Sequence, residues 1–382
     1  MNNENQFIYL DNNATTPLDP RVLEAMMPFL TRLYANASST HKFGLEVNEA
    51  VKKARRQVAD LIGAEEKEIV FTSGATEGIN LALKGAALAN QHKGNHIITL
   101  STEHKAVLDT CEYLEKIGFD VAYLPVQPDG LLDLEVLQKT MREDTILVSV
   151  MYANNEIGVI QPIPEIAAIT HSFDALFFTD ATQAFGKIPI SVCESGIDLM
   201  TFSGHKIYGP KGIGGLYVKN RLKLEEQQHG GGHERGLRSG TLNVSGIVGL
   251  GQAAEIAHNE MQENAQKIGK LRDYLETELL KIEGTYLNGN REKRLYNTSN
   301  IRFEGVDSDA LISGLENIAV SNGSACTSTS IDPSHVLIAL GLNNQAAFQC
   351  IRFSLGRGNG VGEIDYTIEE VVNLVESLRN MV

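Results

Sequence analysis

The sequence predicts an α/β fold in which an open, mostly parallel sheet of seven strands carries helices on both faces. Seven short apolar runs, each bounded by polar residues or glycine, are typical of buried strands. They lie at residues 68–71, 96–100, 121–124, 145–151, 175–179, 198–202 and 215–218. Helical patterns separate most of them, at residues 45–62, 77–89, 105–117, 133–141 and 164–172. Strands that alternate with helices in this way form parallel sheets whose two faces are both covered.

The regular alternation ends near residue 218, which indicates a second domain. A glycine-rich loop at 229–240 leads into a long helical stretch at 244–281, which we expect to form the hinge. From residue 298 onward, short strands and helices alternate less regularly, as in a smaller α+β domain. We expect a large domain at 15–258 and a small domain made of 1–14 and 259–382, with a mobile cysteine-bearing loop at about 321–333.

The composition argues against several classes of partner. The chain has 382 residues, of which 42% are hydrophobic, enough for a large core. Its net charge of −15 leaves no basic surplus for nucleic-acid phosphates or anionic lipids, so we expect neither partner. The N-terminus lacks the pattern of a signal peptide, no apolar run approaches the ~18 residues of a membrane span, and the four cysteines form no C-x-x-C pair. We therefore expect a cytoplasmic protein with reduced thiols.

Two charged residues stand at the ends of neighbouring predicted strands. Lys206 follows the apolar run at 199–202, and Asp180 ends the run at 175–179. A lysine at the mouth of a buried strand is costly unless its amine is neutralised or used. One such use is a Schiff base with an aldehyde cofactor, and a nearby carboxylate could keep a pyridine nitrogen protonated. Lysine plus aspartate in this arrangement is what a pyridoxal phosphate (PLP) enzyme needs.

Further polar residues follow the ends of other predicted strands. The segment 71–77 ends a strand and opens a helix, so its backbone N–H groups and Thr76 could bind a phosphate; an ordinary N-cap is the alternative. His104 could stack on a cofactor ring or relay protons, although a structural role is the alternative. Asn155 and Gln183 could bind a ring hydroxyl or a substrate carboxylate, or they could be loop-capping amides.

A thiol and an arginine in the C-terminal third are further candidates. Small polar residues surround Cys326, so we expect an exposed thiol that is a fair nucleophile; an incidental surface cysteine is the alternative. Arg352, in a short strand-like run, could bind a carboxylate through its planar fork, or it could form a surface ion pair. His229 and His233 bracket three glycines, but no cysteine or carboxylate set accompanies them at ligand spacing, so we expect no metal site.

Taken together, these segments resemble the NifS/IscS-like group of cysteine desulfurases in the class V aminotransferase family. The likeness extends over nearly the whole chain, at residues 9–17, 71–77, 102–107, 154–158, 180–183, 203–212, 229–241, 323–327 and 352–357. Members of this group are PLP enzymes of fold type I. The resemblance therefore implies a large domain with a mostly parallel seven-stranded sheet, a smaller α+β C-terminal domain, and pyridoxal 5′-phosphate as cofactor.

The resemblance also implies roles for individual residues around the cofactor. Lys206 resembles the Schiff-base lysine and Asp180 the partner of the ring nitrogen. Gln183 would bond the ring hydroxyl, and His104 would stack on the ring and act as an acid–base. The phosphate would be held by four residues of this subunit: Ala75, Thr76, Ser203 and His205. Thr241 would reach the phosphate of the other subunit's cofactor, which implies a homodimer.

The implied reaction converts L-cysteine to L-alanine. Asn155 and Arg352 would bind the substrate carboxylate, and Cys326 would take the sulfur as a persulfide before passing it to an acceptor protein, such as an iron–sulfur cluster scaffold. Two other readings stay open. A PLP aminotransferase for small amino acids would need Lys206 and Asp180 but not Cys326. A non-catalytic PLP-binding scaffold would only dock iron–sulfur assembly proteins.

Overall fold

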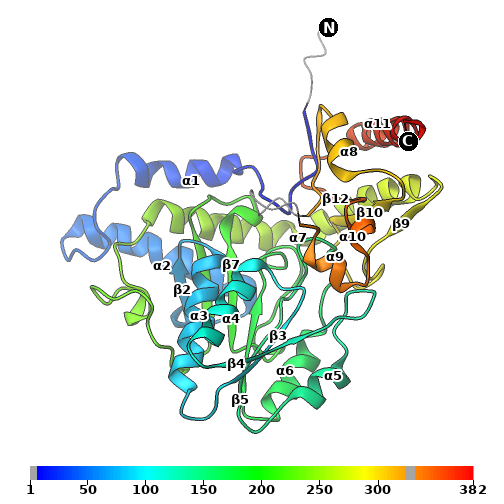
Figure 1. Cartoon of the computed structure of the whole chain (residues 1–382). Coiled ribbons are helices and arrows are strands. Elements are labelled where there is room, and N and C mark those ends of the chain that lie inside the picture. Colours follow the sequence, from blue (N-terminus) through cyan, green and yellow to red (C-terminus); the bar gives the residue numbers. More distant parts are fainter. Residues whose placement is uncertain (1–6, 324–331, 382) are drawn as a thin grey trace.

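The computed structural model describes residues 7–323 and 332–381, and its largest element is a seven-stranded sheet (Figure 1). The strand order is β2-β8-β7-β6-β5-β3-β4. Neighbours from β4 to β7 pair in parallel, whereas β8 runs antiparallel to both β7 and β2. The strands are β2 (Ile69–Thr72), β3 (His96–Leu100), β4 (Asp120–Leu124), β5 (Thr145–Ser149), β6 (Leu176–Asp180), β7 (Leu199–Ser203) and β8 (Gly214–Val218). The predicted sheet is confirmed, with each strand within two residues of its expected position.

Helices cover both faces of this sheet, because its strands are apolar on both sides. One face packs under α3 and α4 in a core that includes Val70, Ile97 and Leu147. The other face packs under α2, α5, α6 and the first half of α7, in a core that includes Phe71, Phe177 and Phe202. The helices are α1 (Pro20–Thr31), α2 (Lys42–Ile62), α3 (Ala75–Asn90), α4 (Lys105–Lys116), α5 (Leu134–Thr140), α6 (Ile163–His171) and α7 (Val244–Leu279).

Helix α1 is an element that the sequence analysis did not predict. Asp19 caps it and Pro20 begins it, which is a typical start signal. Val22 and Met26 are buried, but Leu23 and Met27 are exposed, so apolar residues lie on two sides and blur the helical period. In Figure 1 α1 extends along the edge of the molecule beside α7.

A second core lies at the C-terminal end of α7. A three-stranded antiparallel sheet has the order β12-β10-β9, and α7 and α11 pack on it through residues such as Ile268, Leu275 and Val371. Its elements are β9 (Thr285–Leu287), β10 (Thr298–Phe303), α8 (Ser308–Gly314), β11 (Ile318–Ala319), α9 (His335–Ala339), α10 (Asn344–Ala347), β12 (Cys350–Ser354) and α11 (Val361–Asn380). The exact division of the chain at residue 258 stays a prediction.

The N-terminal segment belongs spatially with this C-terminal part (Figure 1). Strand β1 (Ile8–Tyr9) pairs in parallel with β11, and the backbone of Asn12 bonds to the carbonyl of Ser354 at 2.9 Å. The segment then crosses to the large sheet, where the backbone N–H of Thr16 donates to the carbonyl of His205 at 2.9 Å. Residues 8–16 therefore join the two cores directly above the ends of β6 and β7. Among the described residues, no helix is long and apolar enough to cross a membrane.

Candidate active site

A cleft of about 580 Å³ opens at the carboxyl ends of the parallel strands. Ligands of open α/β sheets gather at this edge, because loops and helix N-termini converge there. The cleft is lined by these residues predicted from the sequence: Ala75, Thr76, His104, Asn155, Asp180, Gln183, Ser203, His205, Lys206 and Arg352. Of the predicted site residues that the structure describes, all but Thr241 therefore line the cleft.

Lys206 and Asp180 reach the cleft from adjacent parallel strands, β7 and β6. Asp180 is the last residue of β6 and is 5% exposed, and its Oδ1 accepts the backbone N–H of Thr182 at 2.9 Å. Lys206 ends a short 3₁₀ turn, Gly204–Lys206, directly after β7. Its Nζ donates to the carbonyl oxygens of Asn13 at 2.6 Å and Ala14 at 2.7 Å. The N-terminal segment thus holds the amine at the cleft.

The N-terminus of α3 forms one end of the cleft. Gly74 precedes the helix, and no side chain of the described chain caps it, so its first N–H groups remain available. Ser203 is buried and approaches Gly74. The helix lies close to the sheet because Gly78 faces Thr201, where a Cβ atom would collide with the threonine hydroxyl. Unpaired N–H groups, the helix dipole and a serine hydroxyl together suit a phosphate.

The two histidines of the cleft play different local roles. His104 is the N-cap of α4, where its Nδ1 accepts the backbone N–H of Ala106 at 3.1 Å. His104 therefore has the structural role considered as an alternative, that of a helix cap, and it also lines the cleft. Burial, followed by Lys206, Lys211 and Lys187, lowers the pKa of His205 to about 4, so its ring is neutral at pH 7.

Arg352 is buried and already engaged. Its Nη2 bonds Asp11 Oδ1 at 2.6 Å, and its Nη1 donates to the carbonyl of Asn155 at 3.1 Å. Its Nε is buried and has no hydrogen-bond partner among the described residues. The sequence analysis considered a surface ion pair for Arg352. The structure shows an ion pair with Asp11 in which Arg352 is buried, and this pair connects the N-terminal segment to β12. The guanidinium still lines the cleft beside Asn155.

Asn13 is the central residue that the sequence analysis missed. Its carbonyl accepts both the Lys206 amine and Gln183 Nε2, the latter at 2.9 Å. Its side-chain Nδ2 donates to Thr298 Oγ1 at 2.9 Å and to the carbonyl of Asn155 at 3.1 Å. The polar run at residues 11–13, inside a segment that carries the family resemblance, was the available signal.

Thr241 is not among the residues that line the cleft. Thr241 is exposed, just past the loop at 229–240. That loop is anchored by two ion pairs, Glu234 with Arg55 at 2.7 Å and Arg238 with Glu77 at 2.7 Å. Cys326 lies outside the described residues, as does most of the predicted loop at 321–333.

The residues of the cleft fit pyridoxal 5′-phosphate group by group. A lysine amine suits the aldehyde, and the buried Asp180 carboxylate suits a protonated pyridine nitrogen. The uncapped end of α3 with Ser203 suits the phosphate. A cleft of about 580 Å³ is in the range that small cofactors occupy.

Comparison with known proteins agrees with this geometry. Residues 8–367 match the family model described as aminotransferase class-V. The chain is 55% identical to cysteine desulfurase IscS of Pectobacterium atrosepticum over 98% of this chain and 94% of the relative. It is 54% identical, with the same coverage, to cysteine desulfurase IscS of Escherichia coli strain K12 / DH10B.

Solved structures are similar over nearly the full length. A NifS-like protein superposes with a TM-score of 0.92 at 41% identity, covering 97% of this chain and 100% of the other. A structure described as SspA in complex with cysteine gives a TM-score of 0.81 at 40% identity, covering 91% of this chain and 98% of the other. The chain therefore belongs to the aminotransferase class-V family and, within it, to the PLP-dependent NifS/IscS-like cysteine desulfurases.

Proposed function

We propose that this enzyme converts L-cysteine to L-alanine and passes the sulfur to Cys326 as a persulfide. The observation that carries the proposal is the meeting of Lys206, Asp180 and the uncapped N-terminus of α3 in one cleft. The reaction balances: the Cβ–S bond of the substrate breaks and its electron pair stays on Cβ, which gains one proton in place of sulfur, while a bond forms between the released sulfur and the Cys326 sulfur. One cysteine and one protein thiol yield one alanine and one protein persulfide.

When bound, the cofactor draws electron density from the carbon skeleton of the substrate. The lysine amine of residue 206 would hold the cofactor and then move a proton to or from the substrate Cα. Asp180 would hold a proton on the ring nitrogen, and its burial strengthens that interaction. Gln183 would donate to the ring hydroxyl, and Ala75, Thr76, Ser203 and neutral His205 would bind the phosphate.

Substrate binding is proposed for Asn155 and Arg352, which lie together in the cleft. No described residue accepts a hydrogen bond from the buried Nε of Arg352, so a substrate carboxylate would satisfy this donor. His104 would stack on the ring and exchange a proton with a thiol. One similar solved structure is described as a complex with cysteine, and this supports the choice of substrate.

We also propose a homodimer in which Thr241 reaches the cofactor phosphate of the partner subunit. Thr241 is exposed and does not line the cleft of its own chain, which suits a contact in trans. Exposed apolar residues line one side of α1 and continue beyond it, a surface that a second copy would cover. They are Leu23, Met27, Leu30, Tyr34 and Leu45.

The proposed setting is the cytoplasm, where the sulfur would go to an acceptor protein such as an iron–sulfur cluster scaffold. The name IscS, borne by the relatives, supports this direction. The net charge of −15 gives no reason to expect nucleic acid as a partner.

The test is incubation of the holoenzyme with L-cysteine. We expect alanine in amounts equal to the sulfur released and, by mass spectrometry, one added sulfur atom on the peptide that contains Cys326. Cys326→Ala should keep the bound cofactor but lose sulfide release, whereas Cys193→Ala, at an exposed cysteine, should leave both unchanged. Accumulation of a keto acid with the amino form of the cofactor would instead establish an aminotransferase.

A further inference from the structure

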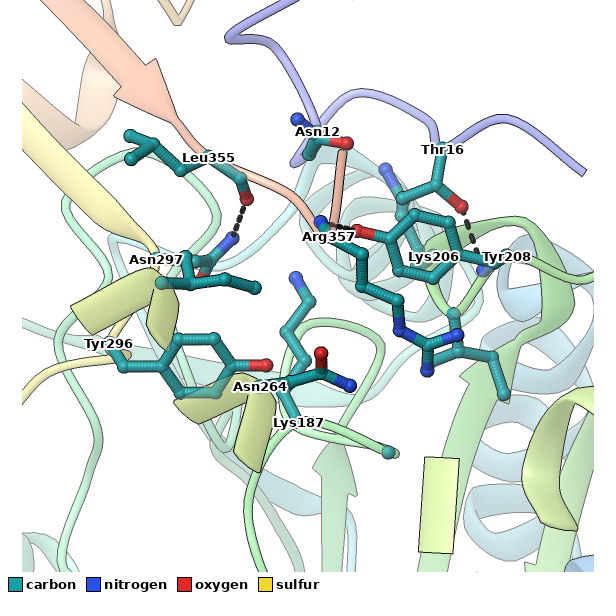
Figure 2. Close-up of a pocket in the computed structure, with 13 residues that line it drawn as sticks. Asn12, Thr16, Lys187, Lys206, Tyr208, Asn264, Tyr296, Asn297, Leu355 and Arg357 are labelled. Atoms are coloured by element: carbon teal, nitrogen blue, oxygen red, sulfur yellow. Dashed lines mark hydrogen bonds between the residues drawn. The ribbon is translucent and has the colours of Figure 1, made fainter. Parts of the chain in front are cut away.

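A buried lysine, Lys187, lies directly behind the cofactor cleft. Lys187 is 7% exposed and lines a separate cavity of about 20 Å³, enough for one water molecule. Figure 2 shows its side chain rising between Tyr296 and Asn297 on one side and Tyr208 and Arg357 on the other. Burial, followed by the charges of Lys206 and Arg352, lowers the pKa of Lys187 to about 7. A buried amine among cations is costly, which indicates that the amine has a use.

The hydrogen bonds of Lys187 lead to the cleft. Its Nζ donates to Gln183 Oε1 at 2.8 Å and to Asn13 Oδ1 at 3.3 Å. Gln183 Nε2 in turn donates to the Asn13 carbonyl at 2.9 Å. Asn13 Oδ1 is fixed as an acceptor because Asn297 Nδ2 also donates to it, at 3.0 Å. Three residues, with the backbone carbonyl of Asn13 as one acceptor, thus form a closed set of hydrogen bonds at the back of the cleft.

This arrangement determines whether the oxygen or the nitrogen of the Gln183 carboxamide faces Lys187. A carboxamide can rotate by half a turn and exchange its oxygen with its nitrogen, and only its partners choose between the two orientations. In its charged form the Lys187 amine donates and never accepts, so that form requires the oxygen of Gln183. The backbone carbonyl of Asn13 only accepts, so it requires the nitrogen. Both partners select the orientation in which the N–H donors lie on the Asn13 side.

We propose that Lys187 is a positioning residue that locks the Gln183 carboxamide so that it presents N–H, and not oxygen, to the cofactor. The inference rests on the proposed function, in which Gln183 donates to the ring hydroxyl. Lys187 does not line the cofactor cleft, so it acts through Gln183 and is not a catalytic group. In its absence the carboxamide is held from one side only, and the flipped form would set an acceptor against an oxygen that is itself an acceptor.

A double-mutant cycle on the holoenzyme tests this inference. The variants are Lys187→Met, Gln183→Leu and the double variant, with Lys53→Met, at an exposed site on α2, as the matched control. The two readouts are the Kd of the apoprotein for PLP and the pH midpoint of the visible absorption of the bound cofactor. Neither readout depends on turnover of cysteine.

Lys187→Met should weaken PLP binding about fivefold to tenfold, the effect of one lost hydrogen bond in a buried site. Its pH midpoint should rise by about half a unit or more, because a lost donor and a lost nearby cation both favour the protonated cofactor. In the Gln183→Leu background the same change should alter Kd by less than about twofold, since the residue through which Lys187 acts is gone. Lys53→Met should match the parent.

Additive effects of the two substitutions on Kd would overturn the inference, as would an unchanged midpoint in Lys187→Met. If Lys187→Met does not fold, Lys187→Gln takes its place in the cycle, which still measures the coupling between positions 187 and 183. A coupling below about twofold in Kd would then overturn the inference. A parent enzyme that binds no PLP would refute the proposed function itself. A parent that binds PLP and desulfurates cysteine, with an additive cycle, would refute the role of Lys187 alone.

Discussion

A variant in which Glu156 is replaced by glutamine should be more stable than the wild type by an amount that grows as the pH rises. Glu156 is 4% exposed, and its Oε2 accepts the hydroxyl of Ser334. Burial raises the pKa of this carboxyl from 4.5 to about 7, although the Ser334 hydroxyl and Arg352 act in the opposite direction. Glutamine has nearly the same shape, keeps an oxygen for Ser334 and carries no charge at any pH.

The size of the effect follows from linkage. Between pH 4.5 and 7 the folded protein binds more protons at Glu156 than the unfolded chain does, so the wild type loses stability as pH rises through this window. At 1.36 kcal/mol per pKa unit, the full difference is about 3 kcal/mol, of which about 2.5 kcal/mol develops between pH 5 and pH 8. The glutamine variant lacks this loss, so its advantage in free energy of unfolding should grow by about that amount.

Urea denaturation of both proteins at pH 5, 6.5 and 8, at one protein concentration, measures the difference. Glu369→Gln, at an exposed site on α11, is the control and should follow the wild type at each pH. A difference between Glu156→Gln and wild type that stays constant or shrinks as pH rises would refute the reasoning. It would mean that the folded protein stabilises the charged form of Glu156 more than its contacts with Ser334 and Arg352 account for.

Three further outcomes are expected. Lys206→Ala should abolish the visible absorption of the PLP-loaded protein near neutral pH, whereas retention of the wild-type spectrum would remove Lys206 from its proposed role. Gly323→Ala should reduce stability by about 1–3 kcal/mol in thermal unfolding, because φ is +85° and the new Cβ would meet Glu156; an unchanged midpoint would contradict this. Arg294→Met should cost about 3–5 kcal/mol in urea, because the buried Glu276 carboxylate loses the guanidinium that now lies 2.6 Å from it and, of its described partners, keeps only the Ser299 hydroxyl and the more distant Arg291. Adding Glu276→Gln should recover much of that loss, and no recovery would show that packing, not charge, is responsible.

The central sheet could be predicted because its signal is local. Each strand is a short apolar run, and the chemistry-bearing residues follow directly at strand ends, so Asp180 and Lys206 were placed at one edge from sequence alone. The neighbouring positions of β6 and β7 confirm that placement. The reversed direction of β8 has no local signature, since a buried strand reads the same either way.

The rest of the site depends on contacts between residues far apart in the chain. Asn13 bonds to Gln183 and Thr298, partners that no local pattern connects with it. Lys187 and Gln183 are four residues apart, which the sequence shows. That Lys187 is buried follows only from the tertiary structure. Likewise, the pairing of Arg352 with Asp11 could not be read from either segment alone.

The course of residues 8–16 has a consequence for the order of events in the cell. The backbone of Asn12 and Asn13 is held by Ser354, and the carbonyl of Asn13 receives Lys206. Residues 8–16 therefore reach their final place only after β12, which follows them in the chain, has been made. A nascent chain that has completed its large sheet already contains the carbonyl groups of Asn13 and Ala14, but β12 is not yet there to hold them in place beside the Lys206 amine. The site that receives the vitamin-derived cofactor is thus complete only after synthesis has passed β12.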